Sequence, residues 1–171
     1  IKYSCNFFRL LLARSKYLKY MKTIKGDLIE LALLGKFEVI IHGCNCFCIM
    51  DAGIAKQIRR NFPAAYEIDR ATNRGDKAKL GTISHAVIGN LIVINAYTQF
   101  NLGKDFNYDA ITNCFKEIKR QFSGKIIGYP KISAGIAGGD WDVISKIIDT
   151  ELAGEDHTLV EYESSGLPNK V

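Results

Sequence analysis

The sequence contains no apolar run that approaches the roughly 20 residues needed to cross a membrane as a helix. Acidic residues are missing from residues 1–20, which hold five of the 23 basic residues, so the other 18 basic residues are balanced by 18 acidic ones. The formal net charge of +5 therefore belongs to the first 20 residues and gives the remainder no basic excess. We expect neither a membrane partner nor non-specific binding of nucleic acid.

The first 20 residues also lack the uninterrupted apolar core of a secretory signal, because Arg9 and Arg14 divide their short apolar stretch. Met21 follows this segment directly ahead of the first predicted strand. The length of the chain and its 47% content of hydrophobic residues suit one domain with an ample core. We predict an N-terminal extension outside the functional fold at residues 1–20, one functional domain at residues 21–163 and a polar tail at residues 164–171.

A second Cys/His pair is missing as well, and this absence bears on zinc binding. Cys44, Cys46 and Cys48 alternate in one run after His42, and these ligand types suit zinc, but the gaps are too short for the chain to wrap an ion. Alternate side chains of an extended segment share one face and cannot form good disulfides over so short a separation. We therefore predict no metal, no cofactor and a reduced, cytoplasmic setting.

The chain does contain a regular alternation of strand and helix patterns. Gly89 and Asn90 form a tight turn that predicts an antiparallel hairpin, and the polar segment 72–80 is typical of a solvated connection. The fold class is α/β: we expect a three-layer α/β/α sandwich with a mixed, mostly parallel central sheet and a ligand crevice at the carboxyl ends of its strands. The hydrophobic periodicity predicts strands at residues 23–25, 37–43, 81–87, 91–97, 125–129 and 159–162, and helices at residues 28–34, 54–61, 64–70, 108–122 and 141–152.

Two glycine-containing loops each join a predicted strand to a predicted helix. The first ends with Asp51 to Ile54 and the second is Ser133 to Gly139. Backbone N–H groups at a helix N-terminus lack intrahelical partners, and the helix dipole adds positive potential, so such loops favour a phosphate. Two loops of this kind indicate a diphosphate ligand. Asp27 and Asp140 each precede a predicted helix, where a carboxylate commonly caps the first turn.

Four short motifs then occur in order along the chain, and together they carry a resemblance to a known family. They are Gly26-Asp27, Gly43-Cys44-Asn45, Ala52-Gly53-Ile54-Ala55 and the run from Pro130 to Ile136. Over residues 21–163 the chain resembles the macro domain, a module that binds ADP-ribose. The Cys44-Asn45-Cys46-Phe47 element and the runs 95–99 and 137–141 look most like the branch described as ADP-ribose 1″-phosphate phosphatases, found in microbes and phages.

The resemblance implies a position for each part of the ligand. Asp27 would accept a hydrogen bond from the adenine amino group, and Asn45 would orient the distal ribose. Asp51 to Ile54 would surround that ribose and one phosphate, while Ser133 to Gly138 would surround the diphosphate. The ligand-binding residues implied in this way are Asp27, Leu28, Cys44, Asn45, Ala52, Gly53, Ile54, Ser133, Ala134, Gly135, Ile136, Ala137 and Gly138.

The resemblance also implies a reaction, the hydrolysis of ADP-ribose 1″-phosphate to ADP-ribose without metal or covalent intermediate. This hydrolysis needs an oriented water, an acid or base and donors for developing negative charge. The candidate catalytic residues are Asn45, His42, Asp51 and Asp140, although His42 also fits a core position on its strand and Asp140 a helix cap. We predict this phosphatase. The alternatives are a non-catalytic reader of ADP-ribose, free or on ADP-ribosylated macromolecules, and a hydrolase of ADP-ribose esters on protein or nucleic acid.

Several positions depart from patterns of the family. Ala55 stands where one hydrolase branch carries an aspartate, and Gln99 and Ala137 stand where another carries a lysine and an aspartate. Neither of these acid/base arrangements for removing ADP-ribose from protein is therefore expected. Asp51 stands where glycine is common, and its carboxylate would repel a phosphate unless the side chain turned toward the ribose or water.

Overall fold

The structure is a computed structural model that describes residues 20–164. The predicted N-terminal extension at residues 1–20 and the tail at residues 164–171 lie almost wholly outside the described residues, so both stay predictions. Within the described part, no helix has the length and apolar character required to cross a membrane. The strands are β1 (Lys22–Gly26), β2 (Val39–Asn45), β3 (Ile83–Ile88), β4 (Leu91–Gln99), β5 (Ile126–Tyr129) and β6 (Asp156–Tyr162). The helices are α2 (Leu28–Leu33), α3 (Gly53–Asn61), α4 (Pro63–Arg70), α5 (Tyr108–Phe122) and α6 (Trp141–Glu151), with a short 3₁₀ helix, η1 (Lys77–Lys79).

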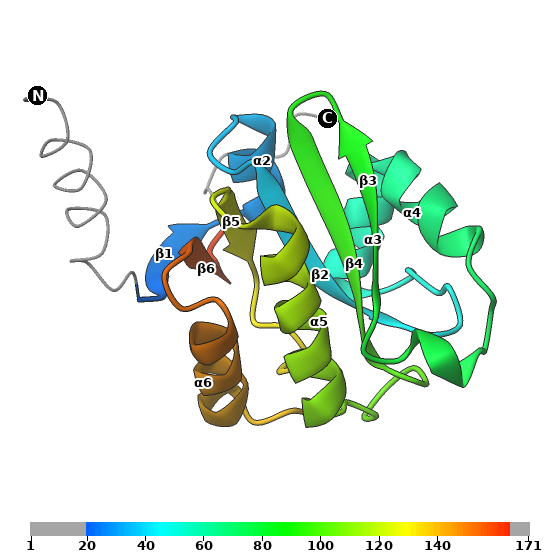
Figure 1. The fold of residues 1–171 in the computed structure, drawn as a ribbon. Coiled ribbons are helices and arrows are strands. Elements are labelled where there is room, and N and C mark those ends of the chain that lie inside the picture. Colours follow the sequence, from blue (N-terminus) through cyan, green and yellow to red (C-terminus); the bar gives the residue numbers. More distant parts are fainter. Residues whose placement is uncertain (1–19, 165–171) are drawn as a thin grey trace, which may run out of the picture.

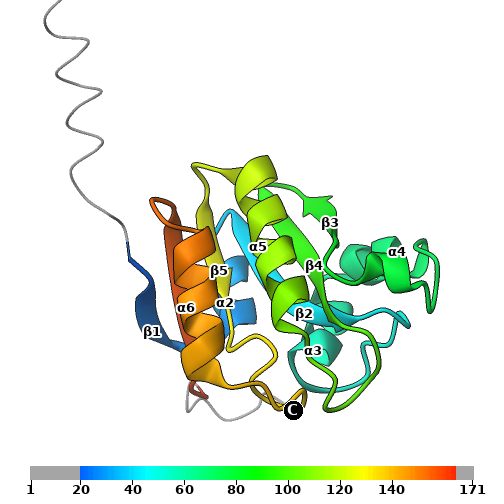
Figure 2. The same cartoon turned by 60° about the horizontal axis from the view of Figure 1, so that its bottom comes forward.

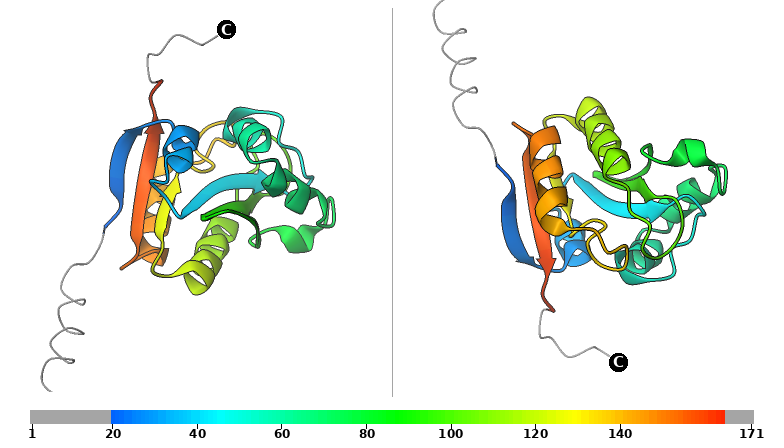
Figure 3. Two further views of the ribbon diagram at one scale, coloured as in Figure 1. Left: turned by 90° about the horizontal axis from the view of Figure 1, so that it is seen from above. Right: turned by 90° about the horizontal axis from the view of Figure 1, so that it is seen from below.

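The six strands form one sheet in the order β1-β6-β5-β2-β4-β3. Every neighbouring pair is parallel except the β3–β4 hairpin, which is antiparallel. Helices α5 and α6 cover one face of the sheet, and α2, α3 and α4 cover the other (Figures 1 and 3). The predicted α/β class, the three layers and the mostly parallel mixed sheet are therefore confirmed.

The side-chain alternation of a strand explains why the sheet is covered on both faces. Val39 and Ile41 of β2 pack with Phe115 of α5 in one core, whereas Ile40 packs with Ile58 of α3 in a second core on the opposite face. All five side chains are fully buried. A continuous apolar run such as 39–41 is what a strand buried on both faces requires.

Strand β2 continues further than the sequence indicates. Its pairing with β4 extends to Asn45, opposite Gln99, with a register shift between Cys44 and Asn45. The prediction that this strand ends at residue 43 is therefore wrong. Small and polar residues commonly mark the end of a strand, but a central strand keeps its ladder hydrogen bonds regardless of such side chains.

The polar segment 72–80 is also less solvated than predicted. Lys79 in η1 is only 7% exposed, and its ammonium group lies 3.5 Å from the carboxylate of Asp69 in α4, which is 1% exposed. The count of charged residues could not reveal this buried pair, because the partner lies on a different helix.

All the parallel strands end toward the same edge of the sheet. The loops after β2, β4 and β5 and the end of β6 come together there, as the views rotated about the horizontal axis make clear (Figure 2). An α/β sheet of this kind places its ligand crevice outside the carboxyl ends of its strands.

Candidate functional site

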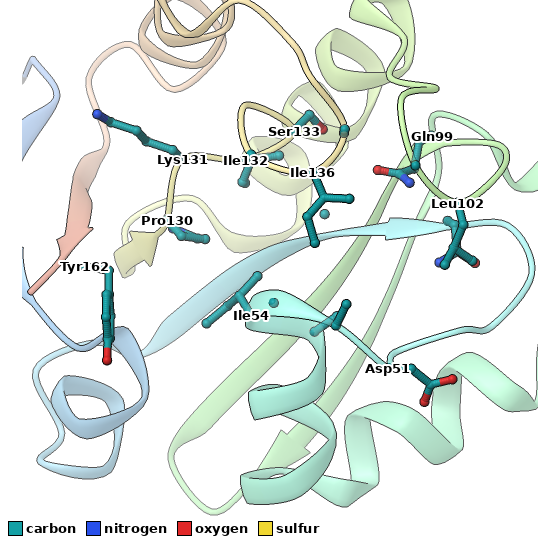
Figure 4. Close-up of a pocket in the computed structure, with 18 of the residues that line it drawn as sticks. Asp51, Ile54, Gln99, Leu102, Pro130, Lys131, Ile132, Ser133, Ile136 and Tyr162 are labelled. Atoms are coloured by element: carbon teal, nitrogen blue, oxygen red, sulfur yellow. The ribbon is translucent and has the colours of Figure 1, made fainter. Parts of the chain in front are cut away.

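A cavity of about 670 Å³ opens at this edge of the sheet. One wall is formed by the loop after β2 with the start of α3, and the opposite wall by the loop after β5 (Figure 4). The loop after β4 and the last residues of β6 complete its two ends. Its volume is within the range of pockets that bind small molecules and cofactors.

The wall at α3 presents backbone donors. The Ala52 N-cap makes no side-chain hydrogen bond to the first turn, whereas Asp27, Asn107 and Asp140 cap α2, α5 and α6 with their side chains. The first bond within α3 runs from Lys56 N to Ala52 O, so no protein acceptor in residues 20–164 takes the N–H groups of residues 53–55. These donors, together with the helix dipole, suit an anion.

The opposite wall is a tightly folded loop that leaves a second set of donors unused. Gly139 N donates to Ser133 O at 2.8 Å, and Gly138 N donates to Gly135 O at 3.0 Å. Ser133 has a φ of 56°, a conformation that a residue with a side chain seldom adopts without other constraints. Inside the described range, the N–H groups of residues 135–137 donate to no protein acceptor.

Glycine is required at two positions where these walls meet. A Cβ on Gly43 would lie 2.9 Å from Thr98 Oγ1, which is closer than Cβ atoms approach other atoms, and 3.3 Å from Ile132 Cγ2, which is a tight contact. Gly53 has a φ of +54°, where an L side chain is strained. Both residues line the cavity, so the absence of side chains here sets its width.

Asn45 folds the loop after β2 through its side chain. Its Oδ1 accepts hydrogen bonds from Phe47 N at 2.9 Å and Ile49 N at 3.3 Å, and its Nδ2 donates to Ile49 O at 2.8 Å. Asn45 lines the cavity and is almost fully buried. Since its amide is occupied by the loop, Asn45 supports the cavity wall.

Asp51 turns its carboxylate away from the cavity, toward the outside of α3 (Figure 4). There its Oδ1 accepts a hydrogen bond from Arg59 Nη1 at 2.5 Å. This geometry removes the electrostatic conflict expected between an aspartate and a bound phosphate, because the guanidinium neutralises the carboxylate outside the cavity.

Exposed apolar side chains line the rest of the cavity. Ile136, Leu102 and Tyr162 are 64%, 50% and 77% exposed, and all three belong to the cavity lining. Ile136 extends from the loop after β5 toward Ile54 of α3, while Tyr162 lies at the opposite end of the cavity from Leu102 (Figure 4). Exposed apolar surface gathered around a concave site is typical of a ligand pocket.

The end of the cavity near β6 carries paired charges. Lys131 lies 2.8 Å from Glu161, and Lys25 lies 3.5 Å from Glu163. The hydrogen bond from Lys131 holds the pKa of Glu161 below its ordinary value. Every carboxylate that lines the cavity, including Asp51, therefore has a cationic partner.

A model of the Macro domain family matches residues 41–148, which span both walls of the cavity. This chain belongs to the macro domain family. The assignment confirms the resemblance seen in the sequence, and it agrees with the parallel sheet and with the site at the carboxyl ends of the strands.

Two relatives found by sequence and one solved structure are similar to this macro domain. An uncharacterized 17.5 kDa protein from the tk-vs intergenic region of Enterobacteria phage T4 is 38% identical over 152 residues, which cover 84% of this chain and 97% of the phage protein. An ADP-ribose 1″-phosphate phosphatase from Candida albicans is 29% identical over 144 residues, covering 76% of this chain and 88% of that enzyme. A Trypanosoma brucei macrodomain solved in complex with ADP superimposes with a TM-score of 0.61 at 16% identity, over 83% of this chain and 63% of that one.

His42 does not reach the cavity of this macro domain. Its side chain is fully buried in β2, and Nε2 lies 2.8 Å from Asn95 Oδ1. Burial lowers the pKa of His42 to about 4, so the imidazole is neutral at physiological pH. This position argues against the catalytic role expected for His42 and fits the alternative of a core residue with a satisfied hydrogen bond.

Asp140 is likewise occupied away from the cavity. Its Oδ1 caps α6 by accepting from Asp142 N at 2.9 Å, and the residue is not part of the lining. The cap, and not the catalytic role, is what its position supports.

Asp27 caps α2 through one oxygen, which accepts from Ile29 N at 2.7 Å and Glu30 N at 3.2 Å. Both bonds use Oδ1, so capping leaves Oδ2 open to a ligand, and the two roles weighed for Asp27 do not compete. Asp27 itself lies just outside the lining, as do four other residues expected to bind ligand: Leu28, Cys44, Ala134 and Gly138.

The remaining expected residues line the cavity: Asn45, Asp51, Ala52, Gly53, Ile54, Ser133, Gly135, Ile136 and Ala137. Sequence reasoning missed other parts of the lining, most clearly Ile49, Leu102, Gly103 and Tyr162. Leu102 follows the carboxyl end of β4 and Tyr162 is the last residue of β6, so the rule for parallel sheets could have indicated them once the strand order was known.

Proposed function

We propose that this macro domain binds ADP-ribose in the cavity and hydrolyses ADP-ribose 1″-phosphate to ADP-ribose and phosphate. The observation that carries the binding proposal is the pair of unused donor sets, residues 53–55 on one wall and residues 135–137 on the other. Two such sets facing one cavity suit a ligand with two adjacent phosphates.

The two ends of the cavity differ in a way that supports one orientation of the bound ADP-ribose. Tyr162 offers an exposed aromatic ring at one end, next to the β1 end where Asp27 keeps Oδ2 open, and this end suits a nucleobase. Asn45 pairs with Gln99, which lies with Leu102 toward the other end (Figure 4), and this end suits the distal ribose. The T. brucei macrodomain complexed with ADP supports an adenosine diphosphate as the common part of the ligand.

The phosphatase reaction is supported by the C. albicans relative, which is named for it. A 1″-phosphate would extend from the distal ribose past Asn45, where the second hydrogen of Nδ2 can orient a water or a phosphate oxygen. Asp51 stands at the same end, and it could act as a base only if its bond to Arg59 opened.

A non-catalytic reader of ADP-ribose is the second candidate, and the paired carboxylates favour it. Asp51, Glu161 and Glu163 each have a cationic partner, and no histidine or cysteine lines the cavity within residues 20–164. A cavity with these groups can hold a diphosphate well while supplying little acid/base catalysis. The phosphatase and the reader therefore both require binding of ADP-ribose, and they differ in whether ADP-ribose 1″-phosphate is hydrolysed.

Calorimetric titration with ADP-ribose, followed by phosphate release from ADP-ribose 1″-phosphate in the same preparation, distinguishes them. Binding with release supports the phosphatase, and binding without release leaves the reader. Absence of binding contradicts both. ADP in place of ADP-ribose measures how much of the affinity depends on the distal ribose.

The matched variants are Asn45→Asp and Asn61→Asp. Asn45→Asp keeps the Oδ1 acceptor for Phe47 N and Ile49 N. It loses the Nδ2 donor, including its bond to Ile49 O, and adds a negative charge next to the 1″-phosphate. We expect phosphate release to fall on the order of a hundredfold, which corresponds to about 2.7 kcal/mol. Asn61 lies at the exposed end of α3, so Asn61→Asp controls for the change of charge.

A further inference from the structure

A cluster of polar side chains lies behind the loop after β2, outside the cavity. The Nζ of Lys79 lies 3.3 Å from the Sγ of Cys48 and 3.5 Å from Oδ1 of Asp69. Lys79 also donates to Cys46 O at 3.3 Å. Lys79 and Asp69 are both more than nine-tenths buried, so the amine is held against the sulfur with little access to solvent.

Cys48 differs from the other cysteines of the described part in its access to solvent. Cys44, Cys46 and Cys114 are buried, whereas Cys48 is partly exposed. Burial raises the pKa of the Cys44 and Cys46 thiols and raises that of Cys114 to about 12, which keeps these three unreactive. Among the cysteines of residues 20–164, an oxidant in solvent therefore meets Cys48 first.

The backbone holds Cys48 in place. Its φ of 57° lies in the left-handed region, and its Sγ donates to Asp69 O at 3.1 Å. A residue with a side chain persists in this conformation only where the surroundings fix it, and the Asn45 bonds on either side supply that constraint. The sulfur thus faces the amine without further rearrangement.

Asp69 completes the site as a proton acceptor. Its Oδ1 accepts a hydrogen bond from the Tyr97 hydroxyl at 2.9 Å. Its Oδ2 is buried and has no hydrogen-bond partner among residues 20–164, which is unusual for a carboxylate oxygen. The carboxylate, whose Oδ1 lies 3.5 Å from Nζ, can take the proton that Lys79 must lose before its nitrogen becomes nucleophilic.

We propose that Lys79 and Cys48 form a modification site at which dioxygen joins Nζ to Sγ through one bridging oxygen atom. The neutral amine and the thiol each lose one hydrogen, an N–O and an O–S bond form, and the second oxygen atom leaves as water. The amine and the thiol are each oxidised by two electrons, and dioxygen is reduced by four. Dioxygen adds to the Cys48 thiol as a sulfur-bound hydroperoxide. The Lys79 nitrogen, already in contact with the sulfur, then attacks the oxygen bound to sulfur and expels the outer oxygen as water.

The bridge would connect two segments that are 31 residues apart in sequence and would fix the loop after β2 to η1. A covalent link of this kind restricts the unfolded chain and so raises the midpoint temperature of unfolding. The same loop contributes Ile49, Asp51 and Ala52 to the cavity, and an effect on ligand exchange would follow only if the proposed function holds.

Peptide mass spectrometry of the full chain after exposure to air, with and without dithiothreitol, tests the proposal directly. We expect the peptides that contain Cys48 and Lys79 to be joined, with one oxygen gained and two hydrogens lost. Dithiothreitol should separate them again, and the oxidised protein should unfold at a higher temperature than the reduced protein. None of these readouts depends on ADP-ribose.

Cys48→Ser should abolish the joined peptides and the rise in unfolding temperature. Cys114→Ser is the matched control, because a serine hydroxyl can replace the Sγ that donates to Thr82 O. This variant should still show the joined peptides and the rise in unfolding temperature. Oxidation of Cys48 to sulfinic acid with Lys79 unmodified, a disulfide of Cys48 with another cysteine, or no oxidation at Cys48 would each overturn the proposal.

Discussion

Ser133 Oγ donates a hydrogen bond to Thr98 Oγ1 at 2.9 Å, and this bond joins the loop after β5 to the end of β4. Gly43 of β2 passes directly beneath it, so close that a Cβ would lie 2.9 Å from the Thr98 oxygen and 3.6 Å from Ser133 Oγ. The strand β2, the end of β4 and the loop after β5 can therefore pack this closely only because residue 43 is a glycine.

Gly43→Ala should weaken ADP-ribose binding by at least about tenfold, because the new methyl group separates the β5 loop from β4 and moves the donors of that wall. The same overpacking should lower the free energy of unfolding by roughly 1–3 kcal/mol. Calorimetric titration and thermal unfolding measure the two effects. Gly135→Ala is the control for folding, because its Cβ would meet nothing within 4 Å, and it should keep the unfolding temperature.

Asp51→Asn should change ADP-ribose affinity by less than about threefold, because the carboxylate turns outward to Arg59 and already has its charge neutralised. Both side chains of this pair are exposed, so the free energy of unfolding should change by less than about 1 kcal/mol. The measurement is titration at low and high salt. Binding that tightens markedly in Asp51→Asn would show that the carboxylate repels the phosphate after all, and loss of phosphate release alone would identify it as the base.

The free energy of unfolding should fall as the pH is lowered from 6.5 toward 4, because burial lowers the pKa of His42 to about 4. In this window the unfolded chain takes up a proton at His42 that the folded protein does not bind, and the stability present above pH 6.5 is lost by roughly 3 kcal/mol. His157, whose pKa is also lowered by burial, acts in the same direction. Urea unfolding across this range measures the slope.

His42→Gln should flatten part of that slope, since an amide can still donate to Asn95 Oδ1 but does not titrate. An unchanged slope in His42→Gln would assign the pH dependence to His157 and other groups.

Lys79→Met should lower the free energy of unfolding by about 3–5 kcal/mol, because it leaves the buried carboxylate of Asp69 without its cation. The double variant Lys79→Met with Asp69→Asn should recover part of this loss, since asparagine can still accept from the Tyr97 hydroxyl without carrying a charge. Equal stability of the single and double variants would mean that the loss comes from packing and from the bond to Cys46 O.

Local patterns in the sequence were sufficient for the elements of the fold. The periodicity of residues 108–122 predicted the bounds of α5, and the Gly89-Asn90 turn predicted the β3–β4 hairpin. Such signals depend on residues a few positions apart, which the sequence presents directly. The same reasoning failed for the end of β2, because pairing with β4 decides where that strand stops.

For the candidate site, the sequence by itself determined the two glycine loops, the helix start that follows the first of them and the resemblance to the macro domain. It could not decide which way a side chain points, since that depends on which other side chains lie within reach once the chain has folded. Only the tertiary structure turned Asp51 to Arg59, buried His42 against Asn95 and brought Tyr162 to the cavity. Likewise, the amine of Lys79 meets the sulfur of Cys48 because two loops fold over the same helix, and no local pattern encodes that contact.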